Sequence, residues 1–514
     1  MGMRSRVASL WALSALGCGA SVTTNPPSNP PPTGVPGQNS VLEEHNAADR
    51  RGVYTQPSLT RAAAGSMHLD PTFKGLFAGN VYSQPLYVEN GPGGKGVFIV
   101  VTENDTIFAL DEQTGNTVWA VTVGQPAGQT GAGCGNISPL GITGTPLIDL
   151  GSRTLFLDAV VGTPDGITTH FIHALSIDDG SERSGGWPLD VSSISFNGLG
   201  FNPVLQNQRG SLTALGNTLY VPYGGHSGDC GDYHGWVVSV PFTGPQGARA
   251  WATASVGGGI WGPAGLASDG QRIFAATGNT IGTSVWGGGE ALIRLQAGPV
   301  FSGQPADFFT PSNWLDLDSQ DLDVGGSGVL LVDAPGSTPS SLAVLLGKNG
   351  IAYLVNRENL GGFGQGNGRS GEGVFSRAVA SSEIINVAAS FTTANGTFVV
   401  FHAQGADCSG DLVALQIVPG SPPGLRTAWC ADNQGEGSPI VTTVDGQAEA
   451  IVWTAGAEGS ERLHGYDALT GALVFGGGGA SDLMANVRRF TTPIAVKGRI
   501  LVLGDGQLFA FTTP

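Results

Sequence analysis

The chain has 514 residues and a formal net charge of −17. A nucleic-acid-binding protein would show a basic patch, and no such cluster occurs here, so this class of partner is excluded. Eighty-three glycines and 31 prolines are spread between apolar runs, and 40% of the residues are hydrophobic. This composition predicts many tight turns around a sizeable core rather than a disordered chain.

The first eighteen residues are typical of an export signal. Arg4 and Arg6 precede an apolar run over 7–16, which is too short to span a bilayer. The run ALGC that ends at Cys18 resembles the site where bacterial lipoproteins are cut and lipidated. We therefore expect a lipid on Cys18 and a cell-envelope location, as an outer-membrane lipoprotein or a periplasmic protein. A plain secretory signal with an incidental cysteine is the alternative.

Residues 19–52 follow the signal and are expected to form a proline-rich flexible spacer. Their segment TTNPPSNPPPTGVPGQ favours an extended, unpacked conformation. No later stretch approaches twenty uninterrupted apolar residues, so membrane contact is expected through the lipid anchor only. Residues 53–514 are expected to form one folded domain.

Two similar units reveal an internal repeat. Residues 106–119 read TIFALDEQTGNTVW, and residues 463–475 read LHGYDALTGALVF. Each unit predicts a strand, an Asp-x-x-Thr-Gly turn and a second strand that ends in an aromatic residue. The Asp side chain caps the amides of the turn, and the Gly supplies a positive φ. We expect the aromatic side chain to cover the neighbouring blade.

Apolar strand pairs recur at intervals of roughly fifty to sixty-six residues. They begin near Pro85, Pro146, Leu212, Pro263, Val329, Ala388, Pro439 and Pro493. This spacing predicts an all-β, eight-bladed β-propeller with four short strands in each blade. Only three strands follow Pro493, so an N-terminal strand from about 67–77 is expected to close the ring, since a propeller with an open edge is poorly stable.

The cysteines predict disulfides. Without Cys18 the chain holds Cys134, Cys230, Cys408 and Cys430, an even number in an exported protein. Four cysteines allow three pairings. Cys408 and Cys430 lie 22 positions apart across one expected strand pair, so we expect these two to join, which leaves Cys134 for Cys230.

The unit at 109–119 resembles the tryptophan-docking repeat of the PQQ-like (quinoprotein alcohol dehydrogenase-like) β-propeller family. Further runs resemble lipid-anchored bacterial members of this family: YSQPLYV (82–88), VTENDTIFALD (101–111), GITGTPLID (141–149), YHGWV (233–237), GGIW (258–261), FAATGN (274–279), DFFTPSN (307–313) and GIAYLVNR (350–357). The resemblance covers nearly all of 75–514. It implies the fold strongly and the activity weakly, because one fold hosts many functions.

The resemblance also bears on cofactors. Alcohol dehydrogenases of this family hold PQQ over a calcium ion bound by carboxylate and amide oxygens, with an aspartate base, and many carry a disulfide between adjacent cysteines. This chain has no adjacent pair, and none of its matching runs supplies the calcium ligands. We therefore expect no cofactor, with PQQ and calcium as the alternative; no catalytic or cofactor-binding residue is assigned.

One loop concentrates polar aromatic residues. Residues 226–236 read HSGDCGDYHGW, a composition that suits a binding site on a loop. The candidate ligand-binding residues are His226, Asp232, Tyr233, His234 and Trp236. The alternative is a disulfide-pinned loop whose His and Tyr side chains bond backbone carbonyls. No metal site is predicted here.

A second polar run, DLDSQDLD at 316–323, holds four carboxylates that could bind calcium. It lacks the Gly and the terminal Glu of an EF-hand, so a solvated acidic loop is favoured.

Three hypotheses for the function remain open. The leading one is a non-catalytic, monomeric cell-envelope propeller that binds a protein or a saccharide on one face. The alternatives are a PQQ-dependent alcohol or sugar dehydrogenase and a scaffold for outer-membrane protein assembly.

Overall fold

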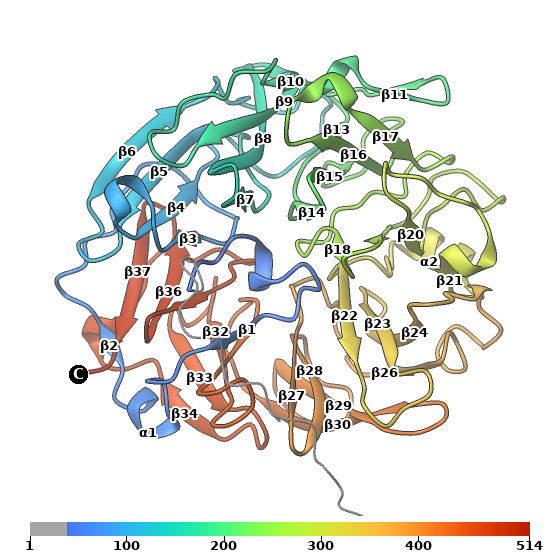
Figure 1. Ribbon diagram of the computed structural model, residues 1–514. Helices are drawn as coiled ribbons and strands as arrows, with labels where there is room; N and C mark the ends of the chain where they lie inside the picture. The colour runs from blue at the N-terminus through green and yellow to red at the C-terminus, as the bar shows by residue number, and fades with distance from the viewer. Residues whose placement is uncertain (1–38) are drawn as a thin grey trace, which may run out of the picture. The chain divides into compact units, whose positions relative to one another are not determined.

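The computed structural model describes residues 39–514, which form a ring of eight β-sheet blades (Figure 1). The predicted all-β, eight-bladed propeller is confirmed. The first strands of the blades begin close to the predicted positions, at Leu86, Leu147, Thr213, Ala267, Val329, Ala389, Ile440 and Ile494. The predicted signal peptide, Cys18 and the first part of the spacer lie outside the described residues.

The first four blades are successive antiparallel sheets. Blade 1 holds β3 (Leu86–Val88), β4 (Val97–Val101), β5 (Thr106–Asp111) and β6 (Thr117–Thr122). Blade 2 holds β7 (Leu147–Asp149), β8 (Thr154–Thr163), β9 (Gly166–Ser176) and β10 (Leu189–Asp190). Blade 3 holds β14 (Thr213–Leu215), β15 (Thr218–Gly225), β16 (Trp236–Pro241) and β17 (Arg249–Ala252), with β13 (Gln206–Asn207) beside β15. Blade 4 holds β18 (Ala267–Ser268), β19 (Ile273–Ala276), β20 (Leu292–Leu295) and β21 (Phe308–Thr310), with β25 (Gly362–Phe363) parallel to β21.

The last four blades repeat the pattern. Blade 5 holds β22 (Val329–Asp333), β23 (Ser341–Leu346), β24 (Ile351–Asn356) and β26 (Phe375–Ala378). Blade 6 holds β27 (Ala389–Thr393), β28 (Gly396–His402), β29 (Leu412–Val418) and β30 (Gly424–Ala431). Blade 7 holds β31 (Ile440–Thr443), β32 (Ile451–Ala455), β33 (Leu463–Asp467) and β34 (Leu473–Gly476), with β1 (Val53–Thr55) parallel to β31. Blade 8 holds β35 (Ile494–Val496), β36 (Arg499–Gly504) and β37 (Gln507–Thr512).

The N-terminal strand β2 (His68–Leu69) is the fourth strand of blade 8. It runs antiparallel to β37, with His68 opposite Thr512 and Leu69 opposite Phe511. This strand lies within 67–77, the stretch that the sequence predicts to complete the last blade. Closure of the ring by this strand stays a prediction.

The repeated turn builds the contact between neighbouring blades. Asp111 accepts hydrogen bonds from two following backbone amides at 3.1 and 2.9 Å, and Gly115 has a φ of +68°. The Trp119 indole N–H then reaches blade 2 and donates to the Ile177 carbonyl at 3.1 Å. A Cβ on Gly180 would lie 2.9 Å from this indole ring, so blade 2 needs glycine where the tryptophan docks.

Helices are few in the described residues. Besides short 3₁₀ turns there are α1 (Arg61–Ala64) and α2 (Trp314–Gln320). No helix in this part of the chain is long and apolar enough to cross a membrane.

Residues 39–52, which the sequence assigns to the spacer, pack into the propeller instead. Val41, His45 and Arg50 are each at most 1% exposed, and the 3₁₀ turn η1 (Glu44–Asn46) lies near the middle of the ring (Figure 1). The folded domain therefore begins earlier than position 53. The reason is chemical: this stretch lacks the prolines of the preceding segment and carries charged side chains that find partners inside the ring.

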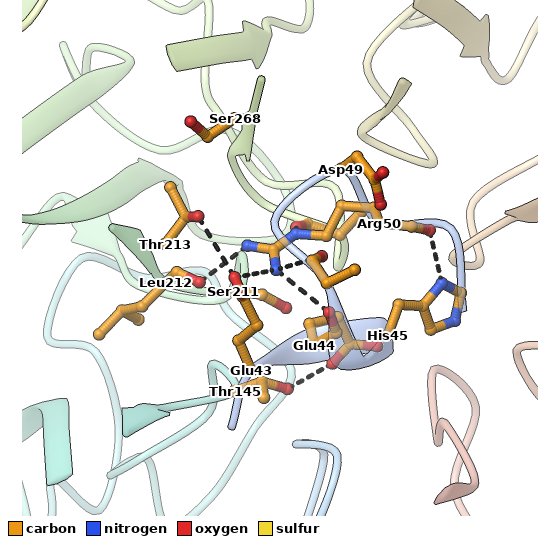
Figure 2. A network of polar contacts seen from close by, with 12 residues as sticks. Glu43, Glu44, His45, Asp49, Arg50, Thr145, Ser211, Leu212, Thr213 and Ser268 are labelled. Carbon is orange, nitrogen blue, oxygen red and sulfur yellow. Dashed lines mark hydrogen bonds and ion pairs between the residues drawn. The ribbon is translucent and has the colours of Figure 1, made fainter. Parts of the chain in front are cut away.

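Arg50 is the centre of these contacts (Figure 2). Its guanidinium donates to the Glu43 carboxylate at 3.0 Å and to the Leu212 carbonyl at 2.8 Å. It also donates to the Ala264 carbonyl at 3.1 Å and to the Glu44 carbonyl at 3.1 Å. These bonds join the N-terminal segment to blade 3 and to the connection into blade 4.

Candidate functional site

The strongest candidate for a functional site is a cavity of about 280 Å³, named here the axial cavity. Its walls come from connections all around the ring: Asn136 follows blade 1, Arg209 precedes blade 3, Trp261 precedes blade 4, and Glu383 precedes blade 6. Phe490, from the connection into blade 8, completes the set. Because these connections surround the ring axis, the cavity lies on that axis.

Arg209 is the distinctive group of the axial cavity. Its guanidinium carbon lies 5.0 Å from the centre of the Trp261 ring and 5.2 Å from that of Phe490. Its Nε donates to the Trp261 carbonyl at 3.2 Å, while Nη1 and Nη2 make no hydrogen bond to any residue in 39–514. No carboxylate of those residues lies within 4.0 Å of it.

Removal from water changes the acidity of this guanidinium. Burial lowers the pKa of Arg209 to about 10, well below the usual value of a guanidinium, against the weaker opposing effects of Tyr82 and Asp323. The direction means that the surroundings disfavour the positive charge. A negatively charged ligand beside Arg209 would offset that cost.

The other two cations of the cavity are already neutralised. The Lys348 ammonium lies 2.6 Å from the Asp321 carboxylate and 2.7 Å from the Asp323 carboxylate. Burial alone would lower the pKa of Lys348, but the charges and hydrogen bonds of Asp323 and Asp321 together outweigh this effect and raise the pKa to about 12. Arg489 pairs with Glu458 at 2.7 Å. Arg209 is thus the cation with free bonding capacity among the cavity residues described.

Two of the five predicted ligand-binding residues reach the cavity. His226 and Tyr233 line it, together with Asp229, whose carboxylate accepts from the Tyr233 hydroxyl at 2.7 Å. Burial lowers the pKa of His226 to about 4, so this side chain is neutral near pH 7. Their binding of a ligand stays a prediction.

The other three predicted residues lie elsewhere. Asp232 is exposed outside the cavity. His234 is buried, and its Nδ1 lies 3.0 Å from the Thr253 carbonyl, as the pinned-loop alternative expected. Trp236 is completely buried in β16 and packs on Phe201 with ring centres 5.5 Å apart. The alternation of side chains along a strand turns Trp236 into the core.

Both predicted disulfides are present. The Cα atoms of Cys134 and Cys230 are 6.0 Å apart, and those of Cys408 and Cys430 are 5.9 Å apart. The first bridge joins the loop after blade 1 to the loop between β15 and β16. The loop at 226–236 is therefore pinned by a disulfide and also lines the axial cavity, so the two interpretations of this loop are compatible.

The acidic run at 316–323 is not a solvated loop. Its first part forms most of α2, and Asp323 is 1% exposed beside Lys348. Asp318 accepts a hydrogen bond from the Thr280 amide at 2.8 Å. Within residues 39–514, no group of three or more His, Cys, Asp or Glu side chains is placed to hold a metal ion.

The sequence interpretation missed Arg209, Trp261 and Lys348 as site residues. Trp261 and Asn279, which also lines the cavity, end the runs GGIW and FAATGN, so these two had a signal in the family resemblance. Arg209 and Lys348 had none, because a single basic residue in a loop is unremarkable until the ring brings it to the axis.

No protein-family model and no curated protein matches the chain. Solved structures are similar in fold. A quinohemoprotein alcohol dehydrogenase from Comamonas testosteroni shares 14% identity over 92% of this chain and 80% of its own, with a TM-score of 0.61. The enzyme ADHIIG of Pseudomonas putida HK5, of the same type, shares 12% identity over the same fractions, with a TM-score of 0.62. A europium-containing methanol dehydrogenase shares 13% identity over 93% of this chain and 89% of its own, with a TM-score of 0.57. The chain therefore has the β-propeller fold of quinoprotein dehydrogenases.

Proposed function

We propose that this protein is an exported cell-envelope propeller that binds a small anionic molecule in its axial cavity. The observation that carries the proposal is the Arg209 guanidinium, which borders the cavity with Nη1 and Nη2 free of partners among the described residues. The N-terminal pattern of the sequence supports export. Lipidation at Cys18 and a role as an outer-membrane assembly scaffold stay predictions.

The size and walls of the cavity indicate the class of ligand. A volume of about 280 Å³ suits a molecule of one or a few rings, near the lower end of the range for small-molecule sites. A guanidinium binds a carboxylate through two parallel hydrogen bonds. The rings of Trp261 and Phe490 pack against the Arg209 guanidinium and restrict its orientation. An acidic saccharide has both the size and the charge, so we favour it over a protein segment.

Calorimetric titration tests this proposal. Galacturonate is the anionic probe, and galactose is its uncharged match. The expected result is that the protein binds galacturonate measurably more tightly than galactose. In the variant Arg209→Gln, galacturonate binding should weaken about 10- to 100-fold, the range for a hydrogen bond to a charged group.

Arg51→Gln serves as the matched control, since Arg51 is an exposed arginine that does not line the axial cavity. Equal affinity for the two sugars, or unchanged galacturonate binding in Arg209→Gln, would overturn the proposal.

A PQQ-dependent dehydrogenase is the second candidate, and the residues fit its cofactor only in part. PQQ is a flat molecule with carboxylates, which agrees with Arg209 beside aromatic walls. The calcium that accompanies PQQ does not fit the donors. Asp321 and Asp323, which line the cavity, pair with Lys348, and Asp229 accepts from Tyr233. Among the described residues this leaves Glu383 as a single unpaired carboxylate on the wall, whereas calcium takes about six to eight oxygen ligands.

Titration with PQQ, with and without calcium, separates the two candidates. Quinone absorbance that co-elutes with the protein, together with dye reduction in the presence of alcohols or sugars, would establish the dehydrogenase. Binding of galacturonate without dye reduction would support the binding protein.

A further inference from the structure

We infer that the Cys134–Cys230 disulfide is a redox-sensitive clamp on the axial cavity, so that its reduction weakens ligand binding. The inference rests on the proposed function of that cavity. Beyond the proposed function, the clamp gives the site a form of regulation, in which a dithiol reductant would weaken binding.

The bridge joins two loops that form one wall of the cavity. Cys134 lies two residues before Asn136, which lines the cavity, and Cys230 directly follows Asp229, which also lines it. The loop of Cys230 supplies the residues 225–229 and Tyr233 to the same wall. The wall is therefore built from two segments that are 96 positions apart in the chain.

Few other bonds hold the two loops together. The Gly135 amide donates to the Ser227 carbonyl at 2.9 Å, and this is the one backbone hydrogen bond between 131–136 and 225–233 in the described structure. A Cβ on Gly228 would lie 3.3 Å from the Cys134 Cβ, so the loops also touch at the bridge itself. The disulfide is the single covalent constraint on this contact.

Both loops have a backbone that needs such a constraint. Gly131, Gly133 and Gly135 in the first loop, and Gly228 and Gly231 in the second, all have positive φ. Glycine reaches these conformations easily and leaves them easily, because it has no Cβ to restrict the chain. Without the bridge, the two loops would sample more conformations, and a ligand would have to order them on binding.

The sulfur atoms are accessible to a reductant, since Cys134 and Cys230 are both partly exposed. One thiolate of a dithiol attacks one sulfur of the bridge, the S–S bond breaks, and a mixed disulfide forms. The second thiol of the reductant then closes its own disulfide and releases the protein. The protein gains two electrons and two protons and ends with two thiols, while the dithiol becomes the oxidised product.

The second disulfide provides a matched control. Cys408 and Cys430 are also partly exposed, and their bridge lies within blade 6, where Cys430 belongs to β30. Neither residue lines the axial cavity. Removing this bridge removes the same kind of bond without touching the cavity wall.

The experiment compares the full chain with the variants Cys134→Ser/Cys230→Ser and Cys408→Ser/Cys430→Ser. Galacturonate affinity is measured by calorimetry, and hydrogen exchange is followed over 226–233. We expect the first variant to bind about tenfold more weakly and to exchange faster in this loop. The second variant should match the wild type in both measurements. Treating the wild type with dithiothreitol should reproduce the first variant.

Each outcome has a separate meaning. Unchanged affinity in a folded Cys134→Ser/Cys230→Ser variant would overturn the clamp and leave the proposed function intact. If the oxidised wild type binds no galacturonate, the proposed function fails, and the exchange measurement then decides whether the bridge holds the wall. Unchanged exchange over 226–233 would overturn the clamp in that case too.

Discussion

Replacing Arg50 by methionine should destabilise the whole propeller, although this residue lies in a segment whose sequence suggests a spacer. Arg50 is fully buried, and its guanidinium makes hydrogen bonds to the Glu43 carboxylate and to the carbonyls of Leu212, Ala264 and Glu44. Methionine keeps most of the side-chain volume and removes the charge. Glu43, whose side chain is 19% exposed, would then lose its ion-pair partner.

The expected loss of stability follows from the kind of contact. Removing one partner of a buried ion pair costs about 3–5 kcal/mol, because the other charge is left uncompensated. Burial already raises the pKa of Glu43 even though Arg50 opposes this shift, so protonation of Glu43 would absorb part of the loss. We expect a decrease of about 3 kcal/mol in the free energy of unfolding, the lower end of that range.

Urea denaturation measures this change, with Arg51→Met as the control next to it. The Arg51 side chain is 58% exposed and pairs with Asp49 alone at 2.7 Å, so its replacement should cost under about 1 kcal/mol. If Arg50→Met also costs under about 1 kcal/mol, the N-terminal segment and the network of Figure 2 contribute little to the stability of the fold.

Four further changes test other parts of the structure. Glu383 is an exposed carboxylate on the wall of the axial cavity, so Glu383→Gln should tighten galacturonate binding about two- to threefold in calorimetry, and weaker binding would argue against an anionic ligand. Burial raises the pKa of Glu103 from 4.5 to about 7, so the folded state binds this proton more tightly than the unfolded state and loses stability as the pH rises from 4.5 to 7. Glu103→Gln should flatten that part of the stability curve in thermal melts, and an unchanged slope would contradict the burial effect. Leu69→Pro removes an amide that donates to Asp482 at 2.8 Å and disturbs the pairing of β2 with β37, so amide exchange in β37 should accelerate if β2 holds the ring closed. Cys18→Ala should release the protein from membranes on fractionation, and an unchanged distribution would rule out lipidation at that position.

The fold could be predicted from the sequence because its signals are local. The turn at Asp111 and Gly115 needs only neighbouring residues, and the same pattern recurs at Asp467 and Gly471, where the structure shows equivalent hydrogen bonds and a φ of +71°. This turn marks the outer strands of a blade, and the recurring apolar strand pairs predict the number of blades. The pairing of Cys134 with Cys230 followed by elimination and is present in the structure.

The candidate site could be predicted only in part, because it depends on contacts between distant segments. The composition of one loop pointed to His226 and Tyr233, which line the axial cavity, whereas Trp236 belongs to strand β16 and is buried in the core. Arg209 becomes distinctive only when the rings of Trp261 and Phe490 lie beside its guanidinium and no carboxylate of the described residues pairs with it. None of these conditions can be read from the residues around position 209.

Arg209 and Phe490 line the axial cavity and also a second cavity that the N-terminal segment borders. A second, much smaller cavity of about 10 Å³ is lined by Arg209 and Phe490 and also by Glu44 of the N-terminal segment. Such a volume holds at most about one water molecule. A ligand can therefore approach Arg209 from the axial cavity but not from the side of Glu44. The stretch that composition alone would assign to a spacer therefore lines the closed side of Arg209, and the axial cavity is the side from which a ligand can reach the guanidinium.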